Sequence, residues 1–219
     1  MSEKSLLFDL DGTLTDSGEG IINSARYAFE RMGYPVPKRE EMGVFIGPPL
    51  WQTFIRFGIP KERSDEAVEL FRERYVPLGK FENTPYPGIR ETLAALQKGG
   101  WKLYVATSKP EVTAVEILEH FDLAKYFVRI CGADMGHDRE NKSDVIAYLL
   151  AQGARNGIRI MVGDTKYDVL GAAQHGIPTI GVSWGYGDVQ EMKDAGAMAI
   201  VDTPQALFAL VEKLGNPTN

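Results

Sequence analysis

The stretch Leu6-Leu7-Phe8-Asp9-Leu10-Asp11-Gly12-Thr13-Leu14-Thr15 contains an apolar run that leads into two carboxylates spaced two residues apart. The apolar residues predict a buried strand, and the acids predict a charged loop at its carboxyl end. Because side chains two apart on a strand share a face, we expect Asp9 and Asp11 to lean toward the same side. Gly12 permits a sharp turn that a residue with a Cβ would resist.

The close spacing of Asp9 and Asp11 calls for a compensating charge, since two carboxylates at short range repel each other. Mg²⁺ prefers oxygen ligands, and it needs only one or two carboxylates before a phosphate completes its coordination shell. The string therefore favours a magnesium site at the end of this strand. Taken alone, an Asp-x-Asp-Gly string is equally consistent with a turn in which aspartate serves as a cap.

The composition is that of an ordinary globular protein, with 219 residues, 44% of them hydrophobic and 25% charged. The net charge of -6 argues against a nucleic-acid partner, and an anionic substrate would need a local positive site. No apolar run reaches membrane-spanning length, so we expect no membrane partner. The single cysteine, Cys131, and the lack of a signal-peptide pattern predict a cytoplasmic location.

Short apolar segments alternate with helical patterns over most of the chain. The first strand is expected to start at Leu6 and to end at the charged loop of Asp9 and Asp11. Further strands are expected at residues 102–106, 128–131, 158–162, 179–182 and 199–201, and a polar loop is expected at 134–141. Such alternation predicts an α/β, Rossmann-like, doubly wound parallel sheet with helices on both faces. In these sheets ligands bind beyond the carboxyl ends of the strands, where Asp9, Thr107 and Asp164 follow their strands.

Residues 17–83 differ in character, because they carry short helical patterns between turn-rich breaks and no convincing buried strand. We expect a small all-helical domain inserted after the first strand, with residues 1–16 and 84–219 forming the α/β core. Within the insertion, the loop 43–50 is rich in glycine and proline. Gly47 in this loop is a candidate substrate contact.

Four strings occur in a fixed order along the chain: residues 8–13, Thr107 at a strand end, Lys142, and Gly163-Asp164-Thr165-x-x-Asp168. Their order and spacing resemble the four signatures of the haloacid-dehalogenase superfamily, most of whose members are phosphatases. The resemblance is closest to the phosphoglycolate phosphatase branch, in which a helical C1-type cap follows the first signature. Residues 17–83 have the position and character of that cap.

The resemblance implies roles for the acidic residues. Asp9 is expected to be the nucleophile that forms an aspartyl-phosphate. Asp11 is expected to protonate the leaving alkoxide and then to activate water. The implied Mg²⁺ ligands are the Asp9 side chain, the Asp11 backbone carbonyl and Asp164, whereas Asp168 holds a metal-bound water or steadies Lys142.

The same resemblance implies a set of groups that hold the phosphate. Thr107 would donate its hydroxyl to a phosphate oxygen, beside the backbone amides of Gly12 and Ser108. Lys142 would supply the fixed positive charge that holds phosphate and nucleophile together. Lys109, two residues past Thr107, is the alternative for that role or a direct contact of the substrate.

The expected activity is that of a Mg²⁺-dependent phosphatase on a small phosphomonoester, with phosphoglycolate as the nearest family substrate. Three alternatives stay open: a 5′-nucleotidase acting on nucleoside monophosphates, a phosphosugar mutase of the same superfamily, and a non-enzymatic, phospho-accepting receiver-like domain. The string Gly181-Val182-Ser183-Trp184-Gly185 matches the nucleophile elbow of serine hydrolases. A helix must directly follow that serine, but Gly185-Tyr186-Gly187 interrupts the chain, so this interpretation is set aside.

Overall fold

The computed structural model describes residues 3–134, 139, 141–153 and 157–215. The chain divides into two compact units, one formed by Met1–Thr15 with Pro85–Asn219 and the other by Asp16–Thr84. Most of the polar loop expected at residues 134–141 lies outside the described residues. Among the residues that are described, every helix is too short or too polar to cross a lipid bilayer.

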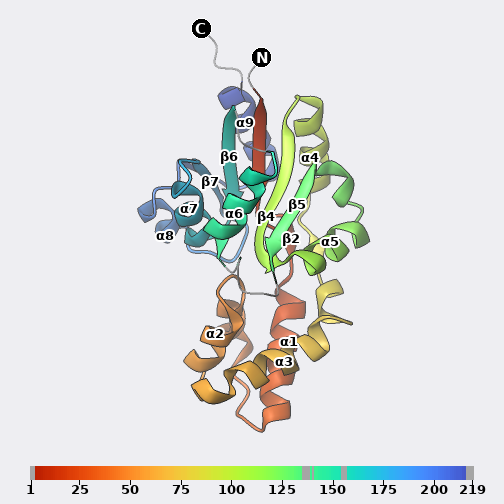
Figure 1. The fold of residues 1–219 in the computed structure, drawn as a ribbon, viewed down its shortest axis with the longest axis vertical. Coiled ribbons are helices and arrows are strands. Elements are labelled where there is room, and N and C mark those ends of the chain that lie inside the picture. The colour runs from red at the N-terminus through yellow and green to blue at the C-terminus, as the bar shows by residue number, and fades with distance from the viewer. Residues whose placement is uncertain (1–2, 135–138, 140, 154–156, 216–219) are drawn as a thin grey trace. The chain divides into compact units, whose positions relative to one another are not determined.

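The first unit is built on a six-stranded sheet whose strands all pair in parallel (Figure 1). Its strand order is β5-β4-β1-β6-β7-β8. The strands are β1 (Lys4–Phe8), β4 (Lys102–Pro110), β5 (Arg129–Ala133), β6 (Ile158–Gly163), β7 (Thr179–Val182) and β8 (Ala199–Val201). The predicted parallel α/β sheet is confirmed. The chain order reverses beside β1, and this switch point is where open parallel sheets bind ligands.

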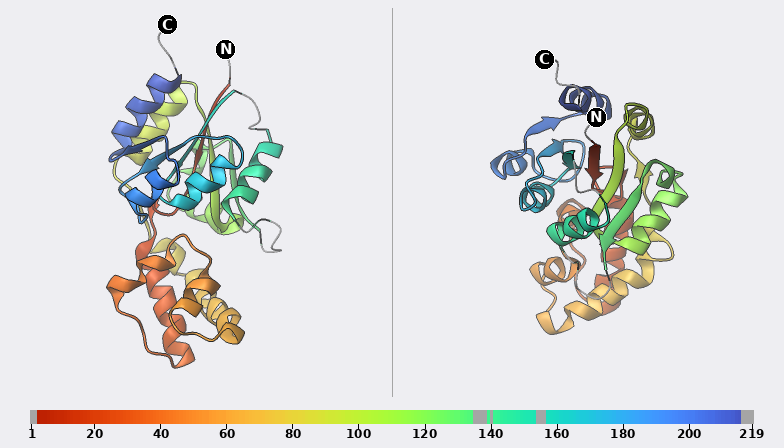
Figure 2. Two further views of the ribbon diagram at one scale, coloured as in Figure 1. Left: turned by 90° about the vertical axis from the view of Figure 1, so that its left-hand side faces the viewer. Right: turned by 45° about the horizontal axis from the view of Figure 1, so that its top comes forward.

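Helices cover both faces of the sheet (Figure 2). One core cluster joins β1 and β4 to α4 (Ile89–Lys98), α5 (Glu111–His120) and α9 (Pro204–Gly215), and the other joins them to α6 (Lys142–Ala151) and α7 (Lys166–Ala173). The helix α8 (Val189–Asp194) contacts β7 and β8. Leu6 and Phe8 point into the first cluster and Leu7 into the second. Because β1 is buried on both faces from Leu6 to Phe8, these three residues form a continuous apolar run rather than an alternating pattern.

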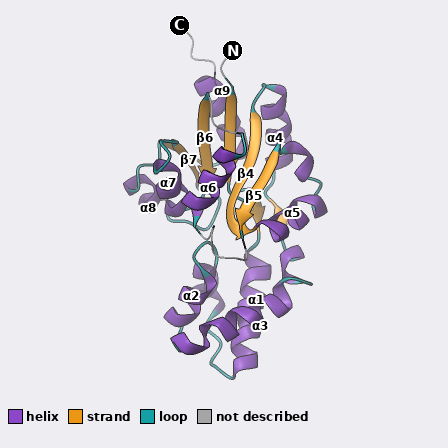
Figure 3. Cartoon of the chain, in the orientation of Figure 1, coloured by secondary structure: helices purple, strands orange, loops and turns teal. Residues whose placement is uncertain are grey.

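The second unit contains helices and loops between its ends (Figure 3). Its α-helices are α1 (Gly18–Met32), α2 (Leu50–Arg56) and α3 (Ser64–Tyr75). Its short 3-10 helices are η1 (Arg39–Phe45), η2 (Lys61–Arg63) and η3 (Gly79–Phe81). Where the chain enters and leaves this unit, β2 (Thr15–Asp16) pairs with β3 (Thr84–Pro85). The aromatic rings of Phe29, Phe45 and Phe54 pack together with centroids 5.0 to 6.2 Å apart. Gly33 ends α1 in the left-handed conformation, as expected of a glycine that follows a helix.

The strand β4 extends further than the sequence pattern predicts, because it ends at Pro110 rather than at residue 106. Its pairing with β5 shifts register: Ala106 pairs with Cys131, and Pro110 pairs with Ala133. From the first of these pairs to the second, β4 moves on by four residues and β5 by only two, which is an irregularity of the bulge type. Pro110 stands at the N-cap of α5 and not in the first turn of the helix.

Replacing Leu103 tests whether the β4 packing stabilises the first unit. Leu103 is fully buried in the first core cluster, so Leu103→Ala is expected to lower the free energy of unfolding by about 2–5 kcal/mol through lost burial and a residual cavity. Val112→Ala, at an exposed position of the adjacent helix α5, is the control and should cost far less. Urea denaturation measures the free energy of unfolding of both variants. Equal decreases in Leu103→Ala and Val112→Ala would contradict the packing of Leu103.

Candidate active site

Asp9 is held at the carboxyl end of the central strand by its own backbone. Its N–H donates to the carbonyl oxygen of Val162 at 2.9 Å, which continues the β1–β6 pairing one residue past β1. Its Oδ1 accepts a hydrogen bond from the Leu10 N–H at 2.8 Å. The sheet therefore places this carboxylate at the switch point between β1 and β6.

The loop after Asp9 turns back on itself at Gly12, which has a φ of +78°. The Gly12 N–H donates to the Thr15 carbonyl oxygen at 2.9 Å. A Cβ at residue 12 would lie 2.1 Å from Oδ2 of Asp164. Glycine is required here both for the left-handed backbone and for the close approach of Asp164.

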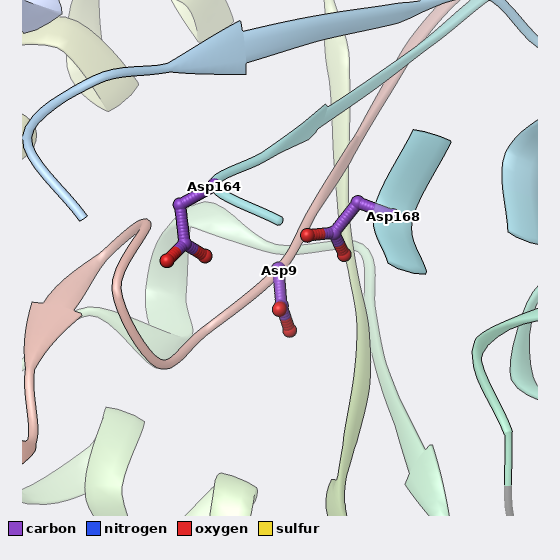
Figure 4. A group of neighbouring side chains, drawn as sticks. All are labelled: Asp9, Asp164 and Asp168. Atoms are coloured by element: carbon purple, nitrogen blue, oxygen red, sulfur yellow. The ribbon is translucent and has the colours of Figure 1, made fainter. Parts of the chain in front are cut away.

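Three carboxylates meet at this edge of the sheet (Figure 4). Asp9 follows β1, Asp164 follows β6, and Asp168 lies in the first turn of α7. One oxygen from each lies within 4.8 Å of the others. Asp164 and Asp168 are both buried. The fold thus brings together acids more than 150 residues apart in the sequence, as the resemblance implied for Asp9 and Asp164.

Lys142 is the cation of this cluster. Its Nζ lies 2.7 Å from Oδ1 of Asp9 and 2.8 Å from Oδ1 of Asp168, and it donates to the Ala106 carbonyl oxygen at 2.9 Å. Asn141 caps the start of α6, because its side chain accepts the Asp144 N–H at 3.0 Å. These contacts fix the lysine between the loop after β1 and the helix α7.

The acids around Lys142 keep its ammonium group charged although its side chain is buried. Burial by itself disfavours the ammonium form. The negative charges of Asp168 and Asp9 outweigh that effect and raise the pKa of Lys142 above its ordinary value. The lysine is therefore a permanent positive charge at neutral pH.

The protein groups around Asp164 and Asp168 do not fully stabilise the ionised forms of these two carboxyl groups. Burial, followed by the charges of Asp168 and Asp9, raises the pKa of Asp164 to about 8. Hydrogen bonds from the Tyr186 N–H at 2.9 Å and the Thr13 hydroxyl at 3.1 Å offset this only in part. Burial likewise raises the pKa of Asp168, despite the opposing effect of Lys142. Three carboxylates against one ammonium fit a divalent cation with oxygen ligands.

Asp11 lies beyond the end of β1, so the alternation of a strand does not place its side chain. Its carboxylate is not one of the three grouped acids. Its Oδ2 lies 2.7 Å from Nζ of Lys109 instead. The two acids that the sequence singled out therefore contact different lysines: Asp9 pairs with Lys142, and Asp11 pairs with Lys109.

Thr107 and Ser108 sit in the register shift of β4. Thr107 is buried, and its hydroxyl accepts the Lys109 N–H at 3.2 Å. Ser108 is partly buried. Gly47 lies in the second unit, just before α2, with a φ of +106°.

A loop after β7 that sequence reasoning did not assign packs against Asp164. A Cβ on Gly187 would lie 1.9 Å from the Asp164 carbonyl oxygen, and a Cβ on Gly185 would lie 2.4 Å from the Asp164 Cβ. The Trp184 Nε1–H donates to the Thr13 carbonyl oxygen at 3.1 Å. Two features of the sequence could have identified this loop: it contains Gly185 and Gly187, and it follows a predicted strand, as the other candidate site residues do.

The family model for haloacid dehalogenase-like hydrolases matches residues 6–182. A 5′-nucleotidase from Pseudomonas aeruginosa is 42% identical over 191 residues, which cover 86% of this chain and 86% of the relative. The tyrosine-protein kinase PtkA of Mycobacterium tuberculosis is 41% identical over 215 residues, which cover 98% of this chain and 73% of the relative.

A phosphoglycolate phosphatase from Agrobacterium fabrum is 32% identical over 215 residues, covering 95% of this chain and 92% of the relative. Among solved structures, a predicted phosphatase from Clostridium acetobutylicum superposes with a TM-score of 0.90 at 39% identity. That match covers 96% of this chain and 99% of the other. The similarity therefore extends through both units of the chain.

The raised pKa of Asp164 makes stability depend on pH when divalent cations are removed. Between about 4 and about 8 the folded protein holds a proton that the unfolded chain has lost, so stability falls as pH rises through this window. In EDTA the melting temperature of the wild type should therefore fall from pH 5 to pH 8 relative to that of Asp164→Asn. Mg²⁺ should raise the melting temperature of the wild type most at pH 8, because it replaces the proton. If the difference in melting temperature between the wild type and Asp164→Asn in EDTA did not change with pH, the raised pKa of Asp164 would be contradicted.

Proposed function

The chain belongs to the haloacid dehalogenase-like hydrolases and is a phosphatase, and we propose that it is Mg²⁺-dependent and hydrolyses a small phosphomonoester through an aspartyl-phosphate intermediate. The observation that carries the proposal is the convergence of Asp9, Asp164 and Asp168, two of which, Asp9 and Asp168, pair with Lys142. The group lies at the switch point of the sheet, where a phosphate can reach it from the strand ends.

The metal site would use the Asp9 side chain, the Asp11 backbone carbonyl and Asp164. Asp168 supports the site through its 2.8 Å contact with Lys142 and could also hold a metal-bound water. Mg²⁺, when bound, supplies positive charge that offsets the repulsion between the carboxylates and the phosphate. The buried carboxylates of Asp164 and Asp168, whose pKa values are raised by burial, support this assignment.

The two steps of the reaction fall to Asp9 and Asp11. A carboxylate oxygen of Asp9 attacks phosphorus while the bond to the substrate oxygen breaks, and Asp11 gives its proton to that departing oxygen. Water then attacks the same phosphorus, Asp11 takes the proton of the water, and the bond between Asp9 and phosphorus breaks. Inorganic phosphate leaves, and both acids return to their starting states.

The remaining groups surround the transferred phosphoryl group. The Thr107 hydroxyl and the Ser108 backbone amide would donate hydrogen bonds to its oxygens. The Gly12 N–H, which the resemblance also implied as a donor, instead donates to the Thr15 carbonyl oxygen at 2.9 Å. Lys142 would hold the phosphate beside Asp9, to which it is already paired at 2.7 Å. These donors stabilise the charge spread over the equatorial oxygens.

For the substrate we propose a small phosphomonoester of the phosphoglycolate type, with a nucleoside 5′-monophosphate as the second candidate. A phosphoglycolate phosphatase and a 5′-nucleotidase among the relatives support these two classes. The helical unit Asp16–Thr84, including Gly47, would act as the cap that selects between them. A panel of phosphomonoesters that includes both classes and a sugar 1-phosphate tests this. Conversion of the sugar 1-phosphate to a 6-phosphate would identify a mutase instead.

Replacing the nucleophile gives the direct test of the mechanism. Asp9→Asn should reduce Mg²⁺-dependent release of phosphate from p-nitrophenyl phosphate by at least about 1000-fold, because no aspartyl-phosphate can form. The exposed acid Asp202 provides a matched control, and Asp202→Asn should retain wild-type activity.

Two results would contradict the proposal. Undiminished turnover by Asp9→Asn would remove Asp9 as the nucleophile. Labelling of wild-type Asp9 by an acyl phosphate without continuing release of phosphate would identify a receiver-like protein.

A further inference from the structure

The ion pair between Lys109 and Asp11 is shielded from solvent. The Lys109 Nζ lies 2.7 Å from Asp11 Oδ2, and the two side chains are 6% and 15% exposed. At the opposite end of the same strand, the Lys102 side chain that pairs with Glu3 is 53% exposed. Salt and water screen the Lys109–Asp11 contact much less than the Lys102–Glu3 contact, so it can hold a side chain in one orientation.

The irregular end of β4 places Lys109 for this contact. The register shift between Ala106 and Pro110 inserts extra residues opposite β5, and the Lys109 N–H is held by the Thr107 hydroxyl at 3.2 Å. Gly132 of β5 lets the two strands approach, since a Cβ there would lie 2.5 Å from the Lys109 carbonyl oxygen. Bulges of this kind redirect side chains beside active sites.

The other carboxylate oxygen of Asp11 is in a different situation. Oδ1 is buried, and it has no hydrogen-bond partner within the described part of the chain. Lys109 therefore occupies one oxygen of the carboxyl group and leaves the second open. A buried polar atom without a partner is costly, and active sites are among the places where such atoms occur.

We propose that Lys109 is a positioning residue for Asp11 and not a binder of the phosphate. The Lys109 ammonium holds Oδ2, and Oδ1 is the oxygen that carries the transferred proton. In the first step the Oδ1 proton passes to the departing alkoxide, which keeps the electron pair of the broken phosphorus–oxygen bond. In the second step Oδ1 takes a proton from the attacking water. This inference rests on the proposed roles of Asp9 and Asp11 in phosphomonoester hydrolysis.

The dependence of kcat/KM on the leaving group tests the role of Lys109. p-Nitrophenolate departs without being protonated, whereas the alkoxide of glycerol 2-phosphate needs a proton. Lys109→Met should lower kcat/KM for glycerol 2-phosphate by about 100-fold and that for p-nitrophenyl phosphate by less than about 5-fold. Asp11→Asn should show the same selective loss. Lys109→Arg keeps a charged donor, so its ratio of kcat/KM for glycerol 2-phosphate to kcat/KM for p-nitrophenyl phosphate should stay near that of the wild type.

Two further measurements separate positioning from phosphate binding and from misfolding. The inhibition constant of inorganic phosphate should change by less than about 2-fold in Lys109→Met, because the phosphate site keeps its other donors. Lys102→Met, at the other end of β4, is the matched control and should behave as wild type. If Lys109→Met does not fold, as judged by its melting temperature, the same ratio is measured in Lys109→Gln.

The outcomes distinguish this inference from the function on which it rests. The inference would be overturned if Lys109→Met lost kcat/KM equally for the two substrates and its inhibition constant for inorganic phosphate rose by more than about 10-fold. That result would make Lys109 a phosphate ligand. The proposed function would survive that result if Asp9→Asn were inactive. If the wild type hydrolysed neither ester and no phosphomonoester of the panel, the proposed function itself would fail.

Discussion

The grouping of three carboxylates at one sheet edge, with a buried ammonium group paired to two of them, is the constraint on which the rest of the site depends. Lys142 contacts Asp9, Asp168 and the Ala106 carbonyl oxygen, and so it joins the loop after β1 and the strand β4 to the helices α6 and α7. Removing one member of a buried ionic group leaves its partner uncompensated, which is far more costly than losing a surface pair. The fold accepts this concentration of charge because the sheet, and not the local sequence, brings the groups together.

The same constraint explains the glycines around Asp164. Gly12, Gly185 and Gly187 each come so close to this residue that a Cβ would overlap it. Backbone from two separate loops therefore surrounds the carboxylate, and the Tyr186 N–H and the Thr13 hydroxyl point at its oxygens. The carboxylate has few alternative positions, so a cation held there would meet a preorganised oxygen ligand.

Asp9 and Asp11 lie two residues apart but in different electrostatic surroundings. Asp9 shares Lys142 with a second acid, whereas Asp11 has a contact with Lys109 and one oxygen that no described residue hydrogen-bonds. Neighbouring acids can take separate chemical roles when their environments differ in this way. The difference arises from β4, whose irregular end supplies Lys109 and whose Ala106 carbonyl binds Lys142.

The sequence by itself determined the alternation of strands and helices and the family, because each signature string is short and can be recognised locally. These features follow from local propensity and from the two-residue and 3.6-residue periods of apolar side chains, which can be recognised in a single segment. Only the tertiary structure decided the register shift of β4, the pairing of Asp11 with Lys109 and the packing of residues 184–187 against Asp164 and Thr13. Each of these joins segments far apart in the chain, and a contact of that kind depends on how strands pair and where loops turn. No local pattern of residues encodes that geometry.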